Sequence, residues 1–394
     1  MKPLDGLIIL DLSRVLACPF ASMILAELGA RVIKVEQPGA GDETRSFEPQ
    51  LAKDSAYYFA CNRSKESITV NLRSDEGRKL IRGLAEKADV LLENFPVGTL
   101  GRYGLDYSAL SSLNPKIIYV SCTGFGQSGP YAEKKGYDTV FQAMGGIMSL
   151  TGEKGGGPVK PGLPVADLTS GLWIAIAILA SLAGRARTGK GCYVDFSMLD
   201  GQVALLTLAA ARFFALGEIS PRLGTEHPGR VPSATFRCKD GKYAHITASD
   251  QHWVPLCNAL GLEQLGSDPD FSSNAARLAR RETVMAALTD AVARLTRAEL
   301  IAKLDAVEVP VGPVNDVAEV LADPHVRARK LIGSFDYPGV GEFKALALPY
   351  KFLGWDDPQI GCPPALGEHT DAILRERLGY TSERIAELRM MRAI

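Results

Sequence analysis

The 394-residue sequence lacks the spacing patterns that mark zinc proteins and disulfide-rich secreted proteins. Its seven cysteines are odd in number and never form a C-x-x-C pair, and its five histidines form no H-x-x-x-H pair. Scattered, unpaired cysteines are typical of reduced thiols in the cytosol, and this spacing builds no zinc site. We therefore expect no bound metal.

The sequence also has no long hydrophobic run and no excess of charge of one sign. The longest apolar run, residues 172–184, is shorter than the roughly 20 residues that span a bilayer. The first residues carry no apolar segment of a secretory signal. With 44 basic and 45 acidic residues, the net charge of −1 gives no bulk attraction for nucleic acid or a membrane surface. We expect a cytoplasmic protein that binds neither.

What is present in the first half is an alternation of short apolar runs with helical patterns. Strands are predicted at residues 7–12, 32–35, 67–72, 90–93, 117–122 and 193–196. Helices are predicted at residues 19–29, 74–88, 139–150 and 168–183. Strands separated by helices of this length favour parallel pairing, so the pattern predicts an α/β fold with helices on both faces of a sheet.

The pattern changes after Leu216, where residues 217–232 are rich in glycine, proline and charge. A strand at 243–247 and helices from about His252 and Glu282 follow, and Thr296-x-x-Glu299 has the form of a capping box. Mixed strand and helix signals return near Lys330. We therefore assign residues 1–216 and 330–394 to a large domain and residues 217–329 to a small one.

Two glycine-containing segments imitate nucleotide-binding motifs. Residues 124–129 fit G-x-G-x-x-G, but they lie outside the first strand–helix unit and are followed by Pro130 and two lysines, which favours a ligand-covering loop. Residues 184–190 resemble a P-loop that lacks the hydroxyl after its lysine and leaves a helix instead of a strand. We interpret them as a basic helix end capped by glycine.

One carboxylate stands out, because Asp167 opens the most hydrophobic helical stretch of the chain. In one interpretation it is an N-cap that accepts hydrogen bonds from free backbone N–H groups. In the other, the helix N-terminus keeps the carboxylate ionised and the apolar helix holds it rigidly, so that it can attack an acyl group. The residue pattern alone leaves both open.

Segments spread over nearly the whole chain together resemble the class III coenzyme A transferases. The matching segments are residues 11–19, 28–36, 41–45, 62–68, 93–95, 124–127, 136–138, 166–167 and 366–370. The resemblance implies a Rossmann-like large domain with a parallel sheet, built from both chain ends, and a smaller central α+β domain. It also implies an interlocked homodimer and no permanently bound cofactor, with acyl-CoA and a free carboxylic acid as substrates.

The resemblance places the family's catalytic aspartate at Asp167, which would form a mixed anhydride with the acyl group and then an aspartyl-CoA thioester. It places the coenzyme along a set of positions that match one at a time. These are the loop residues Val15, Leu16 and Ala17, the phosphate-binding Lys65, Arg102 and Lys135, the pair Asn94 and Phe95, and the residues Tyr137 and Asp138.

Two departures bear on the substrate. Formyl-CoA transferase carries a glutamine where this chain has Leu16, so backbone N–H groups would have to stabilise the oxyanion here. Its four-glycine loop is replaced by residues 225–230. Both changes favour succinyl-CoA or a similar donor and a dicarboxylate acceptor. His227 or Arg230 could then pair with the distal carboxylate, or both could be ordinary loop residues.

Two alternatives remain. An α-methylacyl-CoA racemase would share the fold. The histidine that serves as the base in such racemases is replaced here by Tyr137, which is not a base near neutral pH. A non-catalytic CoA-binding protein would leave Asp167 as a helix cap only.

Overall fold

The computed structural model describes residues 1–394, and the chain divides into two compact units. Unit 1 consists of Met1–Ile147, Lys160–Phe214 and His325–Ile394, so both chain ends contribute to it. Unit 2 consists of Met148–Val159 and Ala215–Pro324. The short segment Met148–Val159 packs with unit 2, which the sequence pattern does not predict.

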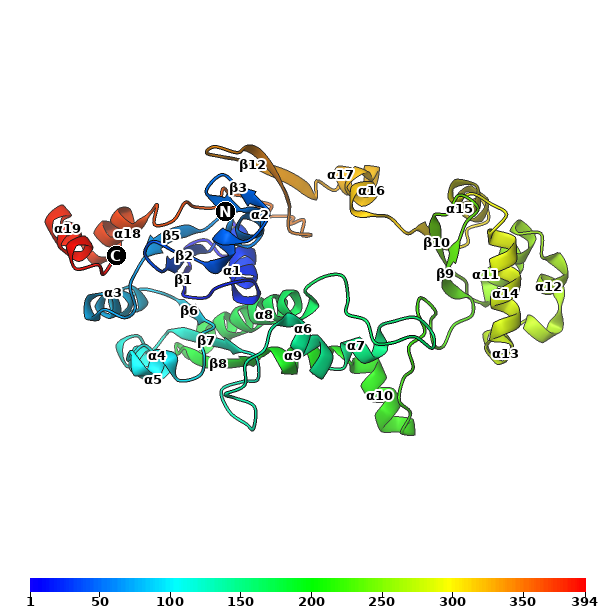
Figure 1. The fold of residues 1–394 in the computed structure, drawn as a ribbon, viewed down its shortest axis with the longest axis horizontal. Coiled ribbons are helices and arrows are strands. Elements are labelled where there is room, and N and C mark those ends of the chain that lie inside the picture. Colours follow the sequence, from blue (N-terminus) through cyan, green and yellow to red (C-terminus); the bar gives the residue numbers. More distant parts are fainter. The chain divides into compact units, whose positions relative to one another are not determined.

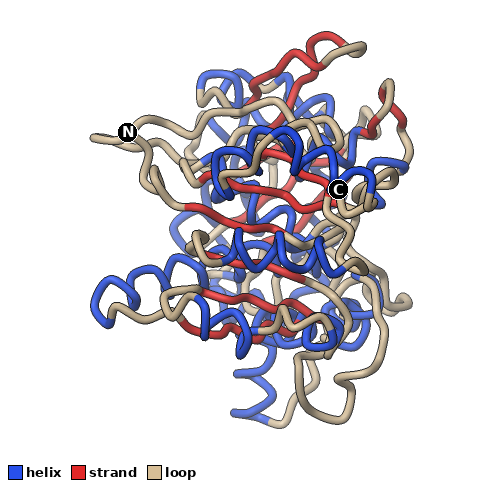
Figure 2. Tube along the Cα trace, turned by 90° about the vertical axis from the view of Figure 1, so that its left-hand side faces the viewer, coloured by secondary structure: helices blue, strands red, loops and turns tan.

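Unit 1 is organised around a six-stranded parallel sheet, whose strands lie side by side with helices in front and behind (Figures 1 and 2). The strand order is β5-β2-β1-β6-β7-β8, which is the 3-2-1-4-5-6 order of doubly wound sheets. The strands are β1 (Ile8–Asp11), β2 (Arg31–Glu36), β5 (Glu66–Thr69), β6 (Val90–Glu93), β7 (Ile118–Thr123) and β8 (Cys192–Ser197). The predicted α/β class is confirmed.

Apolar side chains alternate between the two faces of this sheet, as the period of a strand requires. Ile9 packs into a core with helices α1 (Ala17–Glu27) and α8 (Val165–Thr188). Leu10 points to the other face, which is covered by α3 (Asp75–Ala85), α18 (Thr370–Leu378) and α19 (Ser382–Met390). The C-terminal helices therefore complete the layer opposite α1 and α8.

The other elements of unit 1 connect or cover this core. The helices are α2 (Ala56–Asn62), α4 (Thr99–Arg102), α5 (Tyr107–Leu113), α6 (Asp138–Met144), α9 (Met198–Leu205), α10 (Thr207–Leu216) and α17 (Pro324–Ala328), with the 3-10 turn η1 (Glu43–Ser46). The last residues of α10 and the first residue of α17 belong to unit 2, as does all of α7 (Ile147–Leu150) except its first residue. Two antiparallel hairpins are β3 (Gln50–Leu51) with β4 (Asp54–Ser55) and β12 (Ile332–Tyr337) with β13 (Gly341–Leu346).

Unit 2 has its own apolar core under a three-stranded antiparallel sheet of order β11-β10-β9. The strands are β9 (Ser233–Arg237), β10 (Tyr243–Thr247) and β11 (Val311–Pro313). The helices are α11 (Asp250–Ala259), α12 (Glu263–Ser267), α13 (Asn274–Ala279), α14 (Arg281–Val292), α15 (Arg297–Asp305) and α16 (Val317–Ala322), with the 3-10 turn η2 (Pro269–Phe271). The predicted capping box of Thr296 and Glu299 opens α15.

Helix α8 is longer than its apolar run, because it extends over 24 residues from Val165 to a left-handed C-cap at Gly189. By length and composition alone it could cross a bilayer, and so could the bent pair α9 and α10, a property that core helices of soluble proteins share. The helix predicted at residues 168–183 is too short at both ends. In this fold α8 packs on α1, and Ile174 and Ile178 are fully buried.

Candidate functional site

A cavity of about 740 Å³ opens where the carboxyl ends of four neighbouring strands of unit 1 meet. Ligands of doubly wound sheets bind at this edge, where the strand order reverses. The lining contributed by the strand ends includes Ser13 after β1, Gln37 after β2, Asn71 after β5 and Phe95 after β6. Three further residues come from the C-terminal segment, namely Arg389, Arg392 and Ile394.

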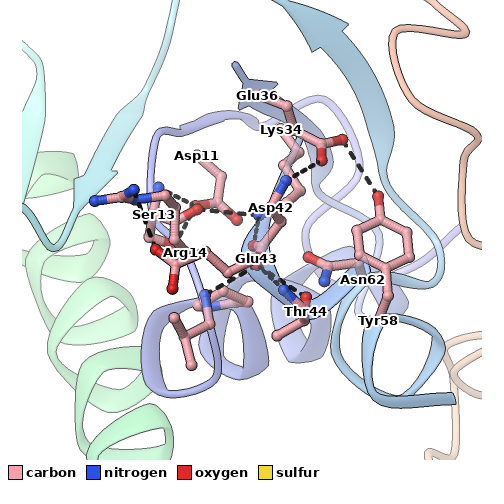
Figure 3. A network of polar contacts seen from close by, with 12 residues as sticks. Asp11, Ser13, Arg14, Lys34, Glu36, Asp42, Glu43, Thr44, Tyr58 and Asn62 are labelled. Atoms are coloured by element: carbon pink, nitrogen blue, oxygen red, sulfur yellow. Dashed lines mark hydrogen bonds and ion pairs between the residues drawn. The ribbon is translucent and has the colours of Figure 1, made fainter. Parts of the chain in front are cut away.

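Several lining residues of this cavity belong to a network of buried polar side chains, part of which is shown in Figure 3. The Lys34 ammonium pairs with Asp42 at 2.8 Å and donates to the Ser13 carbonyl at 3.0 Å. The Asp11 carboxylate accepts from the Ser13 backbone N–H at 2.9 Å and pairs with Lys65 at 3.2 Å. Because each buried charge has a partner of opposite sign, the network holds the loop after β1 in place.

Glu36, the acidic residue at the end of β2, accepts its hydrogen bonds from within this network. Glu36 accepts from the Arg45 guanidinium at 2.7 and 2.8 Å, from the Ser67 hydroxyl at 2.6 Å and from the Asp42 backbone N–H at 2.9 Å. In dinucleotide-binding proteins the acidic residue after this strand binds ribose hydroxyls instead. Glu36 has no free acceptor for that task, so the site differs from a nicotinamide-dinucleotide site.

The loop between β1 and α1 separates this cavity from a second one. Val15 has φ of +70°, a left-handed conformation that is an outlier for a β-branched residue. Asn94 holds the strained loop from the next strand, since its side chain accepts from the Arg14 N–H at 2.9 Å and donates to the Arg14 carbonyl at 2.8 Å. Such strain, held by neighbouring structure, is concentrated at functional sites.

The second cavity, of about 320 Å³, lies on the other side of this loop and contains Asp167. Val15 and Leu16 line it, whereas Ser13 and Arg14 line the larger one. The remaining lining residues are Thr44, Phe47, Tyr57, Cys61, Asp138, Lys160, Gly162, Leu163 and Pro164. In this one loop, Ser13 and Arg14 thus face the larger cavity, and the next two residues, Val15 and Leu16, face the smaller one.

Gly171 brings the two helices that flank the second cavity close together. A Cβ atom at Gly171 would lie 2.7 Å from the Ala17 carbonyl oxygen and 2.8 Å from Phe20 Cδ1. Only glycine permits this crossing of α8 over the first turn of α1. One turn before it on α8, Asp167 is therefore held beside Leu16.

Asp167 is the third residue of α8 and not its N-cap, which is Pro164. The capping contacts come instead from Asp138, whose Oδ1 accepts from the Ala166 N–H at 2.8 Å and the Asp167 N–H at 3.1 Å. The interpretation of Asp167 as a helix cap is therefore wrong. Asp138 occupies the free donors and leaves the Asp167 carboxylate without that structural task.

Burial, followed by the nearby charge of Asp138, raises the pKa of Asp167 to about 7. The expectation that the helix N-terminus keeps this carboxylate fully ionised is corrected by these two larger effects. A carboxyl group with a pKa near 7 is present in both forms at neutral pH. It is also a stronger nucleophile when ionised than an ordinary aspartate.

The structure places Lys65 differently from the phosphate-binding position that the resemblance implied. Its ammonium is buried and donates to Asp11, to Asn62 Oδ1 at 2.9 Å and to the Pro19 carbonyl at 2.9 Å. Burial lowers the pKa of Lys65 to about 8. Because all three donors are used, Lys65 has none left for a phosphate and acts on the first turn of α1 instead.

The other predicted coenzyme residues lie at different distances from the cavities. Phe95 lines the larger one, and the Arg14 guanidinium lies 5.2 Å from its ring centre. Arg102 is exposed and donates at 3.3 Å to Thr99, which also lines that cavity. Ala17 is the buried first residue of α1.

Lys135 and Tyr137 lie on the exposed segment before α6, and Tyr137 is that helix's N-cap residue. Neither side chain lines a described cavity. Their assignment to the coenzyme site stays a prediction.

In unit 2, His227 and Arg230 lie on a loop that neighbouring side chains fix. His227 Nδ1 accepts from the Gly229 N–H at 3.0 Å, and Arg281 donates to the His227 carbonyl at 3.0 Å. Asn274 donates to the Gly229 carbonyl at 3.0 Å. His227 and Arg230 are both exposed on this ordered loop.

Sequence reasoning missed several residues of the larger cavity, most clearly Arg73 and Arg392. Arg73 lies four residues after β5, and Arg392 follows α19 at the other end of the chain. A basic residue just after a predicted strand could have indicated Arg73. No local pattern connects Arg392 with a site more than 300 residues away.

Comparisons with known proteins agree with this arrangement. The model of the family "CoA-transferase family III" matches residues 4–370. Succinyl-CoA:glutarate CoA-transferase of Homo sapiens is 38% identical over 98% of this chain and 89% of its own length. Acetyl-CoA:oxalate CoA-transferase of Acetobacter aceti is also 38% identical, over 95% of each chain.

A solved structure is similar over the same length. The crystal structure of a CAIB/BAIF family protein from Brucella suis shares 42% identity, with a TM-score of 0.86 over 95% of this chain and 99% of that one. Both the sequence and the three-dimensional comparison therefore cover nearly the entire chain. The chain belongs to CoA-transferase family III.

Proposed function

We propose that this protein transfers CoA from an acyl-CoA such as succinyl-CoA to a free dicarboxylate, with Asp167 as the nucleophile. The observation that carries the proposal is the position of Asp167. Its carboxylate lies in a cavity beside the strained loop of Val15 and Leu16, and a separate residue caps its helix.

The two cavities divide the coenzyme between them. The larger one, at the sheet edge, has the volume and the arginines for the nucleotide part of CoA. The pantetheine arm then passes over Val15 and Leu16 and brings the thioester to Asp167. Phe95, at the side of the larger cavity, offers an aromatic surface to the coenzyme.

In the first step, one Asp167 oxygen attacks the thioester carbonyl carbon, the carbon–sulfur bond breaks, and a mixed anhydride and the CoA thiolate result. The thiolate then attacks the aspartyl carbonyl of the anhydride, which releases the donor acid and leaves an aspartyl-CoA thioester. An acceptor carboxylate reverses both steps. Each stage retains the free energy of the thioester in a covalent bond.

Negative charge on the attacked carbonyl oxygen needs a donor that Leu16 cannot supply from its side chain. No side chain caps α1 at Leu16. The N-terminus of α1 therefore offers backbone N–H groups and its positive dipole end next to Asp167. Preorganised donors of this kind stabilise an oxyanion and need no reorganisation.

The dicarboxylate acceptor is proposed because glutarate and oxalate, named for the two similar transferases, are both dicarboxylates. A second carboxylate requires a cation or a hydrogen-bond donor. His227 and Arg230, on the fixed loop of unit 2, are the residues that we propose for it. We further propose that the protein works as an interlocked homodimer in the cytoplasm.

Hydroxylamine trapping tests the covalent step. The protein is incubated with succinyl-CoA and hydroxylamine, digested, and examined by mass spectrometry for a hydroxamate at Asp167. We expect this modification in the wild-type protein and none in the Asp167→Asn variant. CoA exchange without a hydroxamate on the Asp167 peptide would overturn the proposal, and exchange of the acyl α-proton would favour a racemase instead.

A further inference from the structure

The smaller cavity, which contains Asp167, has a single basic side chain in its lining, that of Lys160. All of its lining residues belong to unit 1, so this arrangement is fixed within one unit. Lys160 lies on the segment that leads into α8, shortly before Asp167 in the sequence. An acyl group attached to Asp167 therefore shares its cavity with one cation.

The charge of Lys160 is not used by the protein itself. Its ammonium forms no ion pair and donates only to the carbonyl of the next residue, Pro161, at 3.3 Å. Another lysine shortly before it differs, since Lys154 pairs with Glu282 at 3.6 Å. Because the Lys160 side chain is also exposed, it can turn to a ligand without breaking an ion pair.

The two acidic residues of the cavity make a cation necessary for an anionic ligand. Asp138 is held by other donors, since its Oδ1 accepts from the N–H groups of Ala166 and Asp167, and its Oδ2 accepts from the Gln142 amide. Asp167 is the proposed nucleophile. A third negative charge beside these two is unfavourable unless a positive group faces it. Lys160 is the only lining residue that supplies one.

The remaining walls favour a ligand with an apolar middle. Val15, Leu16 and Leu163 are aliphatic, and Phe47 and Tyr57 form an edge-to-face pair with ring centres 5.9 Å apart. The volume of about 320 Å³ is at the small end of the range for small-molecule sites. A short methylene chain between two carboxyl groups has the size and polarity that these walls accept.

The backbone around Lys160 is held in place at the cavity. Pro161 and Pro164 have fixed φ angles. Between them, the Leu163 carbonyl accepts from the Val165 N–H at 2.8 Å and from the Gln142 amide at 3.4 Å. The segment is thus anchored to the first turn of α8, which carries Asp167, and to α6. Only the side chain of Lys160 has to move when a substrate enters.

We infer that Lys160 binds the distal carboxylate of the substrate and thereby selects dicarboxylates over monocarboxylates. This inference rests on the proposed function, because it takes Asp167 as the nucleophile and places the CoA phosphates in the larger cavity. Lys160 is a further group for the carboxylate already proposed to bind His227 and Arg230. Those two residues lie in unit 2, and the role of Lys160 does not depend on theirs.

Kinetics with two acceptors of equal chain length test the inference. We would measure kcat/KM for glutarate and for pentanoate, which lacks the second carboxylate, with succinyl-CoA as the donor in both cases. We expect the wild-type protein to prefer glutarate. Lys160→Met should reduce this preference about tenfold, as the loss of a hydrogen bond between charged groups predicts. Lys160→Arg keeps the charge and should keep most of the preference.

Two controls separate the charge from other effects. Lys190→Met removes an exposed lysine that follows α8 and lines no described cavity, and it should leave the glutarate preference unchanged. In Lys160→Met, kcat/KM for pentanoate and the melting temperature should stay close to the wild-type values, because an exposed side chain without an ion pair is removed.

An unchanged preference for glutarate in Lys160→Met would overturn the inference. An equal loss for both acceptors would also overturn it, since Lys160 would then serve the coenzyme or the fold. A wild-type protein without a preference for glutarate would contradict the dicarboxylate part of the proposed function and the inference with it. Hydroxamate formation at Asp167 is measured separately, so a failure of the covalent step is distinguishable from a failure of the Lys160 assignment.

Discussion

At the scale of single residues, Asp167 is governed by opposing electrostatic effects. The N-terminal turn of α8 favours its ionised form, whereas burial and the charge of Asp138 favour its neutral form. The net result is a pKa of about 7. In the proposed reaction the attacking species is the carboxylate, so the titration of this group should be visible in the reaction rate.

The pH dependence of turnover is the first prediction. We expect kcat/KM to rise with pH through an apparent pKa near 7, since the fraction of ionised Asp167 rises over that range. Asp138→Asn removes the neighbouring charge, while its amide oxygen can still accept from the α8 N–H groups. The pKa of Asp167 should therefore fall, and the rising limb of the kcat/KM profile should move to lower pH. The measurement is a kcat/KM profile for both proteins.

Glu93 provides the matched control for this profile, because burial also raises the pKa of Glu93 to about 7. Its carboxylate accepts from the Phe95 N–H and lies at the end of β6. Glu93→Gln should leave the position of the limb unchanged. If the rising part of the profile shifts in Glu93→Gln and not in Asp138→Asn, the titrating group is Glu93 and the prediction is contradicted.

The stability of the folded protein gives the second prediction. The folded-state pKa of Asp167 lies above its ordinary value of 3.8, so the folded protein binds more protons than the unfolded chain between about pH 4 and pH 7. This group therefore lowers the free energy of unfolding as the pH rises through that window. Asp167→Asn removes the effect and should be more stable than the wild type at pH 8, by on the order of 2–4 kcal/mol, and similar to it at pH 4.

Urea unfolding at several pH values measures this difference. Asp290→Asn, an exposed position on α14, is the control and should show no pH-dependent gain. A constant difference between Asp167→Asn and wild type across the pH range would show that burial does not penalise the charge.

The sequence draws attention to the proposed nucleophile more readily than to the residues around it. Asp167 stands out because it is a charged residue at the start of an apolar helix, and the structure places it in a cavity. The role of Asp138 as the cap depends on a contact across 29 positions, which no local pattern encodes. The resemblance places Lys65 among the phosphate-binding positions, whereas its burial and its three acceptors are tertiary properties.

At the scale of secondary structure, the parallel sheet follows from the apolar runs. β6 has the bounds predicted for it, and the others differ by only a few residues at their ends. The predicted helix at 139–150 is instead two helices, α6 and α7, because Gly145 and Gly146 interrupt it and a Cβ at Gly145 would lie 2.4 Å from Gln202. Such a break depends on a neighbouring helix, which periodicity does not detect.

The crossing of α1 and α8 carries the third prediction. Gly171→Ala places a methyl group against the Ala17 carbonyl, so the helices must separate and Asp167 must move relative to Leu16. We expect a loss of about 1–3 kcal/mol in the free energy of unfolding and a lower kcat.

Gly184→Ala in the same helix is the control. It has open space around its new methyl and should be more stable by about 0.5–1 kcal/mol, with kcat unchanged. Equal effects at the two glycines would show that helix propensity and not the crossing matters.

At the scale of the whole molecule, the single chain leaves a large apolar surface uncovered on the helices that carry the site. On α8, Leu172, Ile176 and Leu179 are exposed at a spacing of one helical turn, and Ile176 is 54% exposed. Further exposed apolar side chains lie on α9 and α10, namely Val203, Leu205, Leu208, Phe213 and Phe214. Exposed apolar side chains in this number favour an interface with another chain.

The fourth prediction is that a second copy of the chain covers this surface. Light scattering after size-exclusion chromatography should give twice the chain mass of 42.3 kDa. Ile176→Glu places a charge in the middle of the exposed apolar residues of α8 and should shift the protein toward the monomer, because an uncompensated buried charge opposes association. Leu113→Glu, a similarly exposed apolar position at the end of α5, is the control and should stay dimeric.

Helix α8 carries both Asp167 and the exposed apolar residues, so we expect the Ile176→Glu monomer to lose CoA-transfer activity too. A fully active monomer would show that the dimer is not needed to complete the site.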